Sequence, residues 1–226
     1  MSLFKRRVNY DRKLLLAEAE RARSKGRRRR AIALYRRVLA VEPRNLQLNA
    51  RLAPLLAQTR QYFDAWQSFR RVAAAHMSNK QTGEALAVYR QAVRCLPRQI
   101  EAWQGVAEIE RRHGRLEQAR EALLRGRRQF RRRRDRPEAI ALLRAAREIE
   151  PWDADTVLDL ARLLARSGQA PEAQWLLEQF VTRSSGRQLQ QVRGLQWRIE
   201  PSLRHTWYWL RAAVAALRST ERPVPA

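Results

Sequence analysis

The chain has 226 residues, 45% of them apolar, so it is long enough to bury a core and is not a disordered tail. Its 47 Lys and Arg against 22 Asp and Glu give a net charge of +25, which favours an acidic partner: nucleic acid, an anionic membrane surface or an acidic protein. A single cysteine, Cys95, excludes an internal disulfide, and no run of about 18 apolar residues predicts a membrane span. The apolar Leu14–Leu16 run leads directly into Glu18 and Glu20, so we expect no signal peptide and a cytoplasmic location.

Helical periodicity runs through almost the whole chain. Apolar residues return at i, i+3, i+4 and i+7 within each segment, as in the stripe formed by Ala85, Val88, Tyr89, Ala92 and Leu96. The chain has only 8 Gly and 9 Pro to interrupt helices. In chain order the predicted helices are 11–25, 28–41, 46–59, 62–79, 82–96, 99–113, 116–133, 137–149, 154–167, 170–183, 187–199 and 202–218.

Three prolines, Pro43, Pro97 and Pro151, are spaced 54 residues apart and reveal an internal repeat. Alanines recur with the same period in two registers, at steps that alternate between 34 and 20 residues. They are Ala31, Ala65, Ala85, Ala119, Ala139 and Ala173. This alternation predicts three helices in every 54 residues, with the middle helix serving as the second helix of one pair and the first helix of the next.

Two segments resemble the tetratricopeptide repeat. They are Gly26 through Ala31, Tyr35 and Pro43, and Trp103 through Gly114, Ala119 and Leu123. The resemblance covers roughly residues 10–200 and implies an all-α, right-handed α-solenoid of antiparallel helix pairs, about 11–12 helices in a 54-residue three-helix super-repeat. It also implies a concave groove that binds peptides or partner subunits. The chain departs from the family pattern at Arg127, where a small residue is usual, and at Arg60 and Lys80, where the turn glycine is usual.

We expect one continuous repeat array over residues 1–201, a capping helix over 202–218 and a flexible tail over 219–226. The last unit is four residues short of the period, and the segment Thr182–Gly186 is where we place the shortfall. Trp207 and Trp209 lie in the final helix, which either seals the end of the stack or serves as an aromatic anchor for a partner or a membrane interface.

Residues that could perform chemistry are few and scattered. His76, His113 and His205 lie far apart without metal-ligand spacing, and Cys95 is expected to be a buried structural thiol. Asp153 and Asp155 are expected to stabilise a helix N-terminus. We therefore expect no catalytic residues, no metal, no cofactor and no small-molecule substrate, and hence no enzyme.

Two arginine runs are the candidate binding residues. They are Arg27, Arg28, Arg29 and Arg30, and then Arg125, Arg127, Arg128, Arg131, Arg132, Arg133 and Arg134. The runs are separated by about two repeat periods, so they fall near equivalent turns, which align along one edge of a solenoid. We expect a basic ridge there, since the arginine fork binds carboxylates and phosphates well.

The sequence favours a protein-interaction scaffold that binds an acidic protein partner or complex subunit. Two alternatives stay open: RNA or DNA binding through the nucleic-acid backbone, and a peripheral membrane adaptor. The identity of the partner and the oligomeric state are left open by the sequence.

Overall fold

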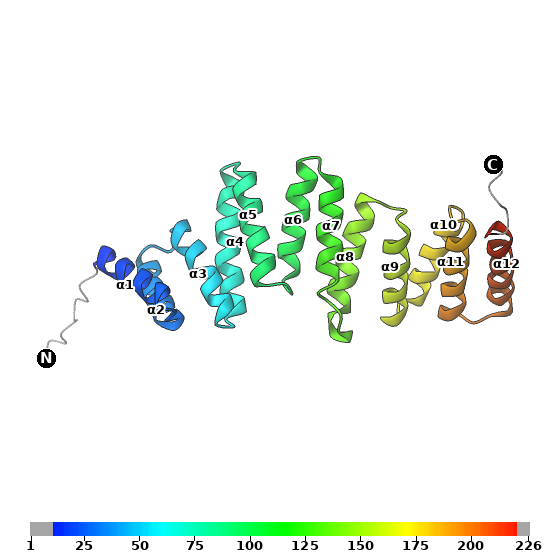
Figure 1. Cartoon of the computed structure of the whole chain (residues 1–226), viewed down its shortest axis with the longest axis horizontal. Coiled ribbons are helices and arrows are strands. Elements are labelled where there is room, and N and C mark those ends of the chain that lie inside the picture. Colours follow the sequence, from blue (N-terminus) through cyan, green and yellow to red (C-terminus); the bar gives the residue numbers. More distant parts are fainter. Residues whose placement is uncertain (1–10, 221–226) are drawn as a thin grey trace. The chain divides into compact units, whose positions relative to one another are not determined.

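The computed structural model describes residues 11–220, apart from the side chains of 216–220, and this part of the chain is an all-α repeat fold (Figure 1). It divides into two compact units within one helix: unit 1 ends at Val106 and unit 2 begins at Ala107. The predicted tail lies outside the described residues from 221 on, whereas Ser219 and Thr220 belong to the last helix. The helices are α1 (Arg12–Ser24), α2 (Arg28–Val41), α3 (Leu46–Gln58), α4 (Tyr62–Ser78), α5 (Thr82–Cys95), α6 (Ile100–Arg112), α7 (Leu116–Arg127), the 3-10 helix η1 (Arg133–Asp135), α8 (Arg136–Ile149), α9 (Ala154–Arg166), α10 (Ala170–Val181), α11 (Gly186–Ile199) and α12 (Leu203–Thr220).

Helix starts repeat at 54-residue intervals, as the spacing of the prolines predicts. Helices α2, α5 and α8 begin at Arg28, Thr82 and Arg136. The same 54-residue interval separates the starts of α3, α6 and α9, and also those of α4, α7 and α10. Helix α11 begins at Gly186, four residues before the position that the period requires. The shortening lies in the connection from α10 to α11, residues 182–185, which fall within the predicted segment Thr182–Gly186.

A left-handed residue ends most helices that precede a tight turn. Gly26 and Lys80 share one register, at φ 69° and 59°, and Arg60, Gly114 and Gly168 share the other, at φ 63°, 73° and 83°. After each of them the next backbone N–H bonds to a carbonyl five residues earlier, as in a Schellman motif. Arg60 and Lys80 therefore adopt the turn conformation that the family pattern assigns to glycine.

The six recurring alanines lie in the core between helices. Each has an exposed fraction of 0%, three of them in unit 1 and three in unit 2. Large side chains fill the space around them: Tyr35 and Phe69 in unit 1, Leu143 and Leu177 in unit 2, all nearly or fully buried. Because a methyl side chain lets two helices approach closely, the recurring alanines set the distance between neighbouring helices.

The middle helix of two three-helix groups packs against both of its neighbours, as predicted. In unit 1, α4 packs against α3 and α5, and in unit 2, α10 packs against α9 and α11. Helix α3 also contacts α5, and α9 contacts α11. Each unit thus has a face where the first and third helices of a group lie side by side.

The predicted helix 116–133 is wrong at its C-terminal end, because α7 stops at Arg127. Gly126 weakens the helix there, and continuing it would place several arginines at i, i+4 spacing, where like charges repel. The chain instead turns so that Phe130, with an exposed fraction of 5%, enters the core. Asp135 then accepts a hydrogen bond from the backbone N–H of Arg132 before α8 begins.

Candidate functional site

The first predicted arginine run lies at the start of α2. Arg27 is the N-cap residue and Arg28, Arg29 and Arg30 form the first turn, and all four are exposed. A helix N-terminus favours negative charge, and no acidic residue lies in this first turn. Arg30 approaches Glu18 at 3.7 Å, which is the one carboxylate pairing that the described structure gives this run. The run therefore concentrates cations where the local backbone disfavours them.

The second predicted run extends from the end of α7 through the connection to α8. Arg128, Arg131, Arg132 and Arg133 are exposed on this connection, and Nε of Arg131 donates to the carbonyl oxygen of Arg128. Arg134 is 3.7 Å from Asp135. These guanidinium groups thus stand outward on an irregular segment rather than on the predicted helix.

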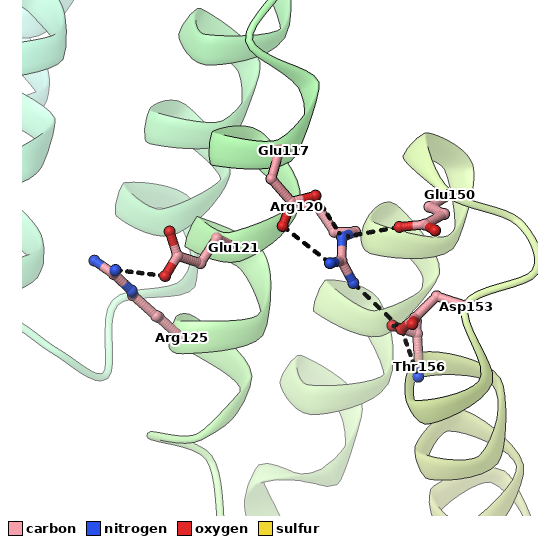
Figure 2. A network of polar contacts seen from close by, with 7 residues as sticks. All are labelled: Glu117, Arg120, Glu121, Arg125, Glu150, Asp153 and Thr156. Atoms are coloured by element: carbon pink, nitrogen blue, oxygen red, sulfur yellow. Dashed lines mark hydrogen bonds and ion pairs between the residues drawn. The ribbon is translucent and has the colours of Figure 1, made fainter.

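Two further members of the second run have carboxylate partners within unit 2. Nη2 of Arg125 lies 2.5 Å from Glu121, on the same helix (Figure 2). Arg127 holds Asp159 of α9 through two bonds, Nε at 2.9 Å and Nη2 at 3.0 Å. This half-buried pair explains the departure from the family pattern, since the arginine replaces a small contact with an ionic one between two helices.

Other arginines of unit 2 are also neutralised locally. Figure 2 shows the guanidinium of Arg120 among three carboxylates, Glu117 at 3.0 Å, Glu150 at 3.0 Å and Asp153 at 3.4 Å. Asp153 caps α9 as well, because its side chain accepts the backbone N–H of Thr156 at 3.0 Å. The predicted capping role of Asp153 is confirmed, and the network links α7 to the start of α9.

Unit 1 has a groove of about 490 Å³ on the face where α3 and α5 lie side by side. Its lining residues come from the end of α1, the start of α2, α3 and α5: Arg23, Ser24, Gly26, Arg28, Ala50, Arg51, Pro54, Leu55, Gln58 and Gln91. Arg28 therefore belongs both to the first arginine run and to this groove.

Two arginines of the unit 1 groove share one carboxylate, Glu20. Arg23 and Arg51 lie 2.7 and 2.8 Å from its oxygens, and the hydroxyl of Tyr35 donates to it at 2.7 Å. The Tyr35 hydrogen bond, followed by the two guanidinium groups, holds the pKa of Glu20 below its usual range against the opposing effect of burial. Burial and this bond raise the pKa of Tyr35 to about 12. Arg28 has no ion pair with any described residue, so it is the uncompensated cation of this groove.

Unit 2 has a pocket of about 360 Å³ between α9, the start of α10 and α11. Arg162, Arg166 and Arg198 line it together with four apolar residues, Ala165, Ala170, Leu195 and Ile199. The three arginines are exposed and make no side-chain ion pair with the described residues, and no carboxylate lines the pocket. We call this site the triple-arginine pocket.

The repeat relates the triple-arginine pocket to the unit 1 groove. Helices α3 and α9 are two periods apart, so Arg162 and Arg166 stand where unit 1 has Pro54 and Gln58. Sequence reasoning missed these arginines because they do not form a run. Their i, i+4 spacing on a helix whose other face is apolar was the available signal.

The two predicted anchor tryptophans lie on different faces of α12. Trp209 packs onto α11, where its ring stacks on Trp197 at a centroid distance of 6.1 Å. Trp207 points away, with an exposed fraction of 64%. The residues therefore do not form one aromatic cluster.

The described residues 11–220 contain no group of three or more His, Cys, Asp and Glu side chains arranged to hold a metal ion. In the same range, no helix combines the length and apolarity that crossing a bilayer would need. Cys95 is half-buried rather than fully buried, and burial raises the pKa of its thiol, which lowers its reactivity at neutral pH.

Comparison with known proteins identifies a repeat in unit 2. The sequence model of the tetratricopeptide-repeat family matches residues 132–181, which include α8, α9 and α10. No curated protein matches the chain.

Among solved structures, the chain is 19% identical to putative kinesin light chain repeats of Podosopora anserina, with 93% of this chain and 97% of that one covered and a TM-score of 0.32. A thermophilic repeat protein of Thermus thermophilus is 18% identical, with 91% and 90% covered and a TM-score of 0.32. A tetratricopeptide-repeat protein of Parabacteroides merdae is 16% identical, with 92% and 91% covered and a TM-score of 0.30. Such identities and TM-scores carry no function over to this chain.

Proposed function

Because this chain is built of tetratricopeptide-like helical repeats, we propose that it is a non-catalytic protein-interaction scaffold whose grooves bind an acidic segment of a partner protein. The observation that carries the proposal is the triple-arginine pocket. Arg162, Arg166 and Arg198 surround an apolar floor without any carboxylate of the chain itself. The proposal includes a cytoplasmic location, which the single cysteine favours.

Charge balance distinguishes this pocket from the paired arginines of unit 2. Arg120, Arg125 and Arg127 are each neutralised by carboxylates of unit 2. In the triple-arginine pocket three guanidinium groups lie near one another without a carboxylate to neutralise them. A carboxylate of the ligand would reduce the repulsion among these groups and accept charge-assisted hydrogen bonds from them. Each such bond contributes about 1.5–3 kcal/mol when it is shielded from water.

The apolar floor favours a peptide over a bare anion. Leu195, Ile199 and Ala165 line the pocket beside the guanidinium groups, so an aliphatic side chain next to the acidic residue would be buried with it. In unit 1 the corresponding face offers Gln58, Gln91 and Arg28, which can hydrogen-bond an extended backbone. The ligand we propose is thus a segment in which acidic and aliphatic residues alternate.

Backbone binding of RNA is the second candidate function, and the exposed side chains of Arg128 and Arg131–Arg133 favour it. These cations lie on an open segment rather than in a pocket, so the phosphates of an extended backbone have access to them. The two functions depend on different arginines and can be separated by mutation.

The test compares two variants that each remove three positive charges. One carries Arg162→Gln, Arg166→Gln and Arg198→Gln, and the matched control carries Arg128→Gln, Arg131→Gln and Arg132→Gln. Fluorescence anisotropy would measure the Kd of a labelled 12-residue peptide of alternating Glu and Leu, and of a labelled 30-mer RNA, at about 150 mM salt, where charges beyond about 8 Å are screened.

We expect the pocket variant to bind the peptide at least about tenfold more weakly, a loss of about 1.4 kcal/mol, while the control variant binds it nearly as wild type does. Equal losses in both variants would show that net charge alone drives binding and would contradict the pocket. Tight RNA binding that only the control variant loses would establish the second function instead.

A further inference from the structure

Helix α12 presents an apolar stripe that the described residues of unit 2 leave uncovered. Leu203, Trp207, Leu210 and Val214 have exposed fractions of 91%, 64%, 48% and 48%. Their spacing of four, three and four residues places them along one side of the helix. We call these four residues the α12 stripe.

The opposite side of α12 is the one that unit 2 buries. Trp209 stacks on Trp197 of α11, and Ala212 is buried. Gly194 of α11 makes room for this contact, since a Cβ there would lie 3.1 Å from Nε1 of Trp209. Helix α12 is therefore fixed in rotation about its axis, and the α12 stripe is held facing outward.

Positive charges border the α12 stripe. Arg204 and Arg211 are exposed and seven residues apart, and the sequence from Leu203 to Thr220 contains no Asp or Glu. Arg204 is held over the ring of Tyr208, with its guanidinium carbon 5.6 Å from the ring centroid. The surface thus combines a narrow apolar strip with cations that have no carboxylate on their own helix.

We propose that the α12 stripe binds an amphipathic helix of a partner protein, with the partner's apolar residues on Trp207 and Leu210 and its acidic residues beside Arg204 and Arg211. Helix-on-helix packing is how α11 already covers the inner side of α12, and the outer side offers apolar anchors at the i, i+4, i+7 spacing that helix recognition uses. This surface is separate from the grooves of the proposed function.

A second copy of the chain is a poorer occupant on electrostatic grounds. Its α12 would bring the same apolar residues but no carboxylate for Arg204 or Arg211. It would also bring a second chain with a net charge of +25. Like charges at an interface oppose association, whereas an acidic helix complements them.

The test uses a labelled 18-residue peptide with a leucine stripe flanked by Glu, a scrambled peptide of the same composition, and a version with Lys in place of Glu. Fluorescence anisotropy would measure Kd for the full chain and for three variants. They are Trp207→Ala with Leu210→Ala, Arg204→Gln with Arg211→Gln, and the control Trp175→Ala. Trp175 is exposed to a similar degree, 54%, but lies on α10. Circular dichroism would verify that each variant keeps its helix content.

We expect the full chain to bind the acidic helix at least tenfold more tightly than either comparison peptide. The Trp207 and Leu210 variant should lose this binding, the Arg204 and Arg211 variant should weaken it and flatten its salt dependence, and Trp175→Ala should leave it unchanged. The triple-arginine pocket variant should also bind this peptide normally, so failure of one proposal is distinguishable from failure of the other.

Three results would overturn the proposal. The first is unchanged peptide affinity after Trp207→Ala with Leu210→Ala. The second is a dimer in sedimentation velocity that this variant dissolves, which would make a second copy the occupant. The third is binding to vesicles of phosphatidylcholine and phosphatidylserine that the same variant abolishes, with no preference among the peptides, which would make the stripe a membrane contact.

Discussion

Arg60 and Lys80 adopt left-handed backbone conformations that ordinarily favour glycine. At φ 63° and 59° they stand at the same turns where Gly114, Gly168 and Gly26 stand in other repeats. A residue with a Cβ pays roughly 1–2 kcal/mol to adopt this region. The sequence identifies both positions, because the repeat aligns them with the turn glycines even though neither is glycine.

Glycine at these two positions should stabilise the fold. We expect Arg60→Gly and Lys80→Gly each to raise the free energy of unfolding by about 1 kcal/mol, since strain is relieved while some unfolded-state entropy is gained. Urea unfolding followed by circular dichroism would measure the change. Arg60→Ala is the matched control, because it removes the charge and keeps the strain, so it should stabilise the fold less than Arg60→Gly does.

The reverse change tests the same idea from the other side. Gly114→Ala should lower the free energy of unfolding by about 1 kcal/mol. A Cβ at Gly114 meets no atom within 4 Å, so backbone strain is the only cost. If Gly114→Ala were neutral and Arg60→Gly gave no gain, the strain at these turns would be smaller than the backbone angles imply.

Glu20 connects three helices of unit 1. It lies on α1, accepts a hydrogen bond from Tyr35 of α2 and pairs with Arg51 of α3. Because its pKa is lowered in the folded state, it stabilises the fold fully above its unfolded value of 4.5. This stability is lost as the pH falls through the folded-state pKa.

Replacing this carboxylate should therefore have a pH-dependent cost. We expect Glu20→Gln to lower the free energy of unfolding by about 1 kcal/mol at pH 7, a value discounted because a third of the side chain is exposed. Melting temperatures of wild type and variant, measured from pH 7 to pH 3, should converge below pH 4.5. A gap that stays constant over this range would mean that Glu20 acts through packing rather than charge.

Helix boundaries were predictable where local chemistry agrees with the repeat. The Asp153 cap, the glycine turns and the prolines place most ends within one or two residues of those observed. The end of α7 was not predictable from the sequence. It is decided by the burial of Phe130 and by repulsion among arginines, and neither of these effects produces a periodic pattern. The triple-arginine pocket could not be predicted either, because it depends on tertiary packing. Arg198 lines the same pocket as Arg162 and Arg166 only because α11 packs beside α9.

The charge of the whole molecule opposes its own folding. A net charge of +25 on 226 residues creates repulsion that local pairs such as Arg127–Asp159 relieve only in part. Exposed ion pairs contribute about 0.2–1 kcal/mol each, so salt should remove more repulsion than attraction. The basic ridge across both arginine runs stays a prediction, since each run is described within its own unit.

Added salt should therefore stabilise the chain. We expect the melting temperature to rise by several degrees between about 20 and 300 mM NaCl, because the screening length falls from roughly 20 to 6 Å over this range. Calorimetry would measure the melting temperature. The Arg128, Arg131 and Arg132 variant is the comparison: its melting temperature should be higher at low salt and should rise less as salt is added. A melting temperature that falls with salt would mean that ion pairs outweigh the net repulsion.

The sharing of α4 between two helix pairs also constrains how such a chain can change length. The tight turns that contain Pro43, Pro97 and Pro151 follow equivalent helices, α2, α5 and α8. Unequal recombination between the gene segments that encode two of these turns would add or remove 54 codons. The resulting chain would still connect helices that pack together. A gain or loss of 34 codons would leave one shared helix without its second partner. Tandem growth of this protein should therefore proceed in modules of three helices rather than two.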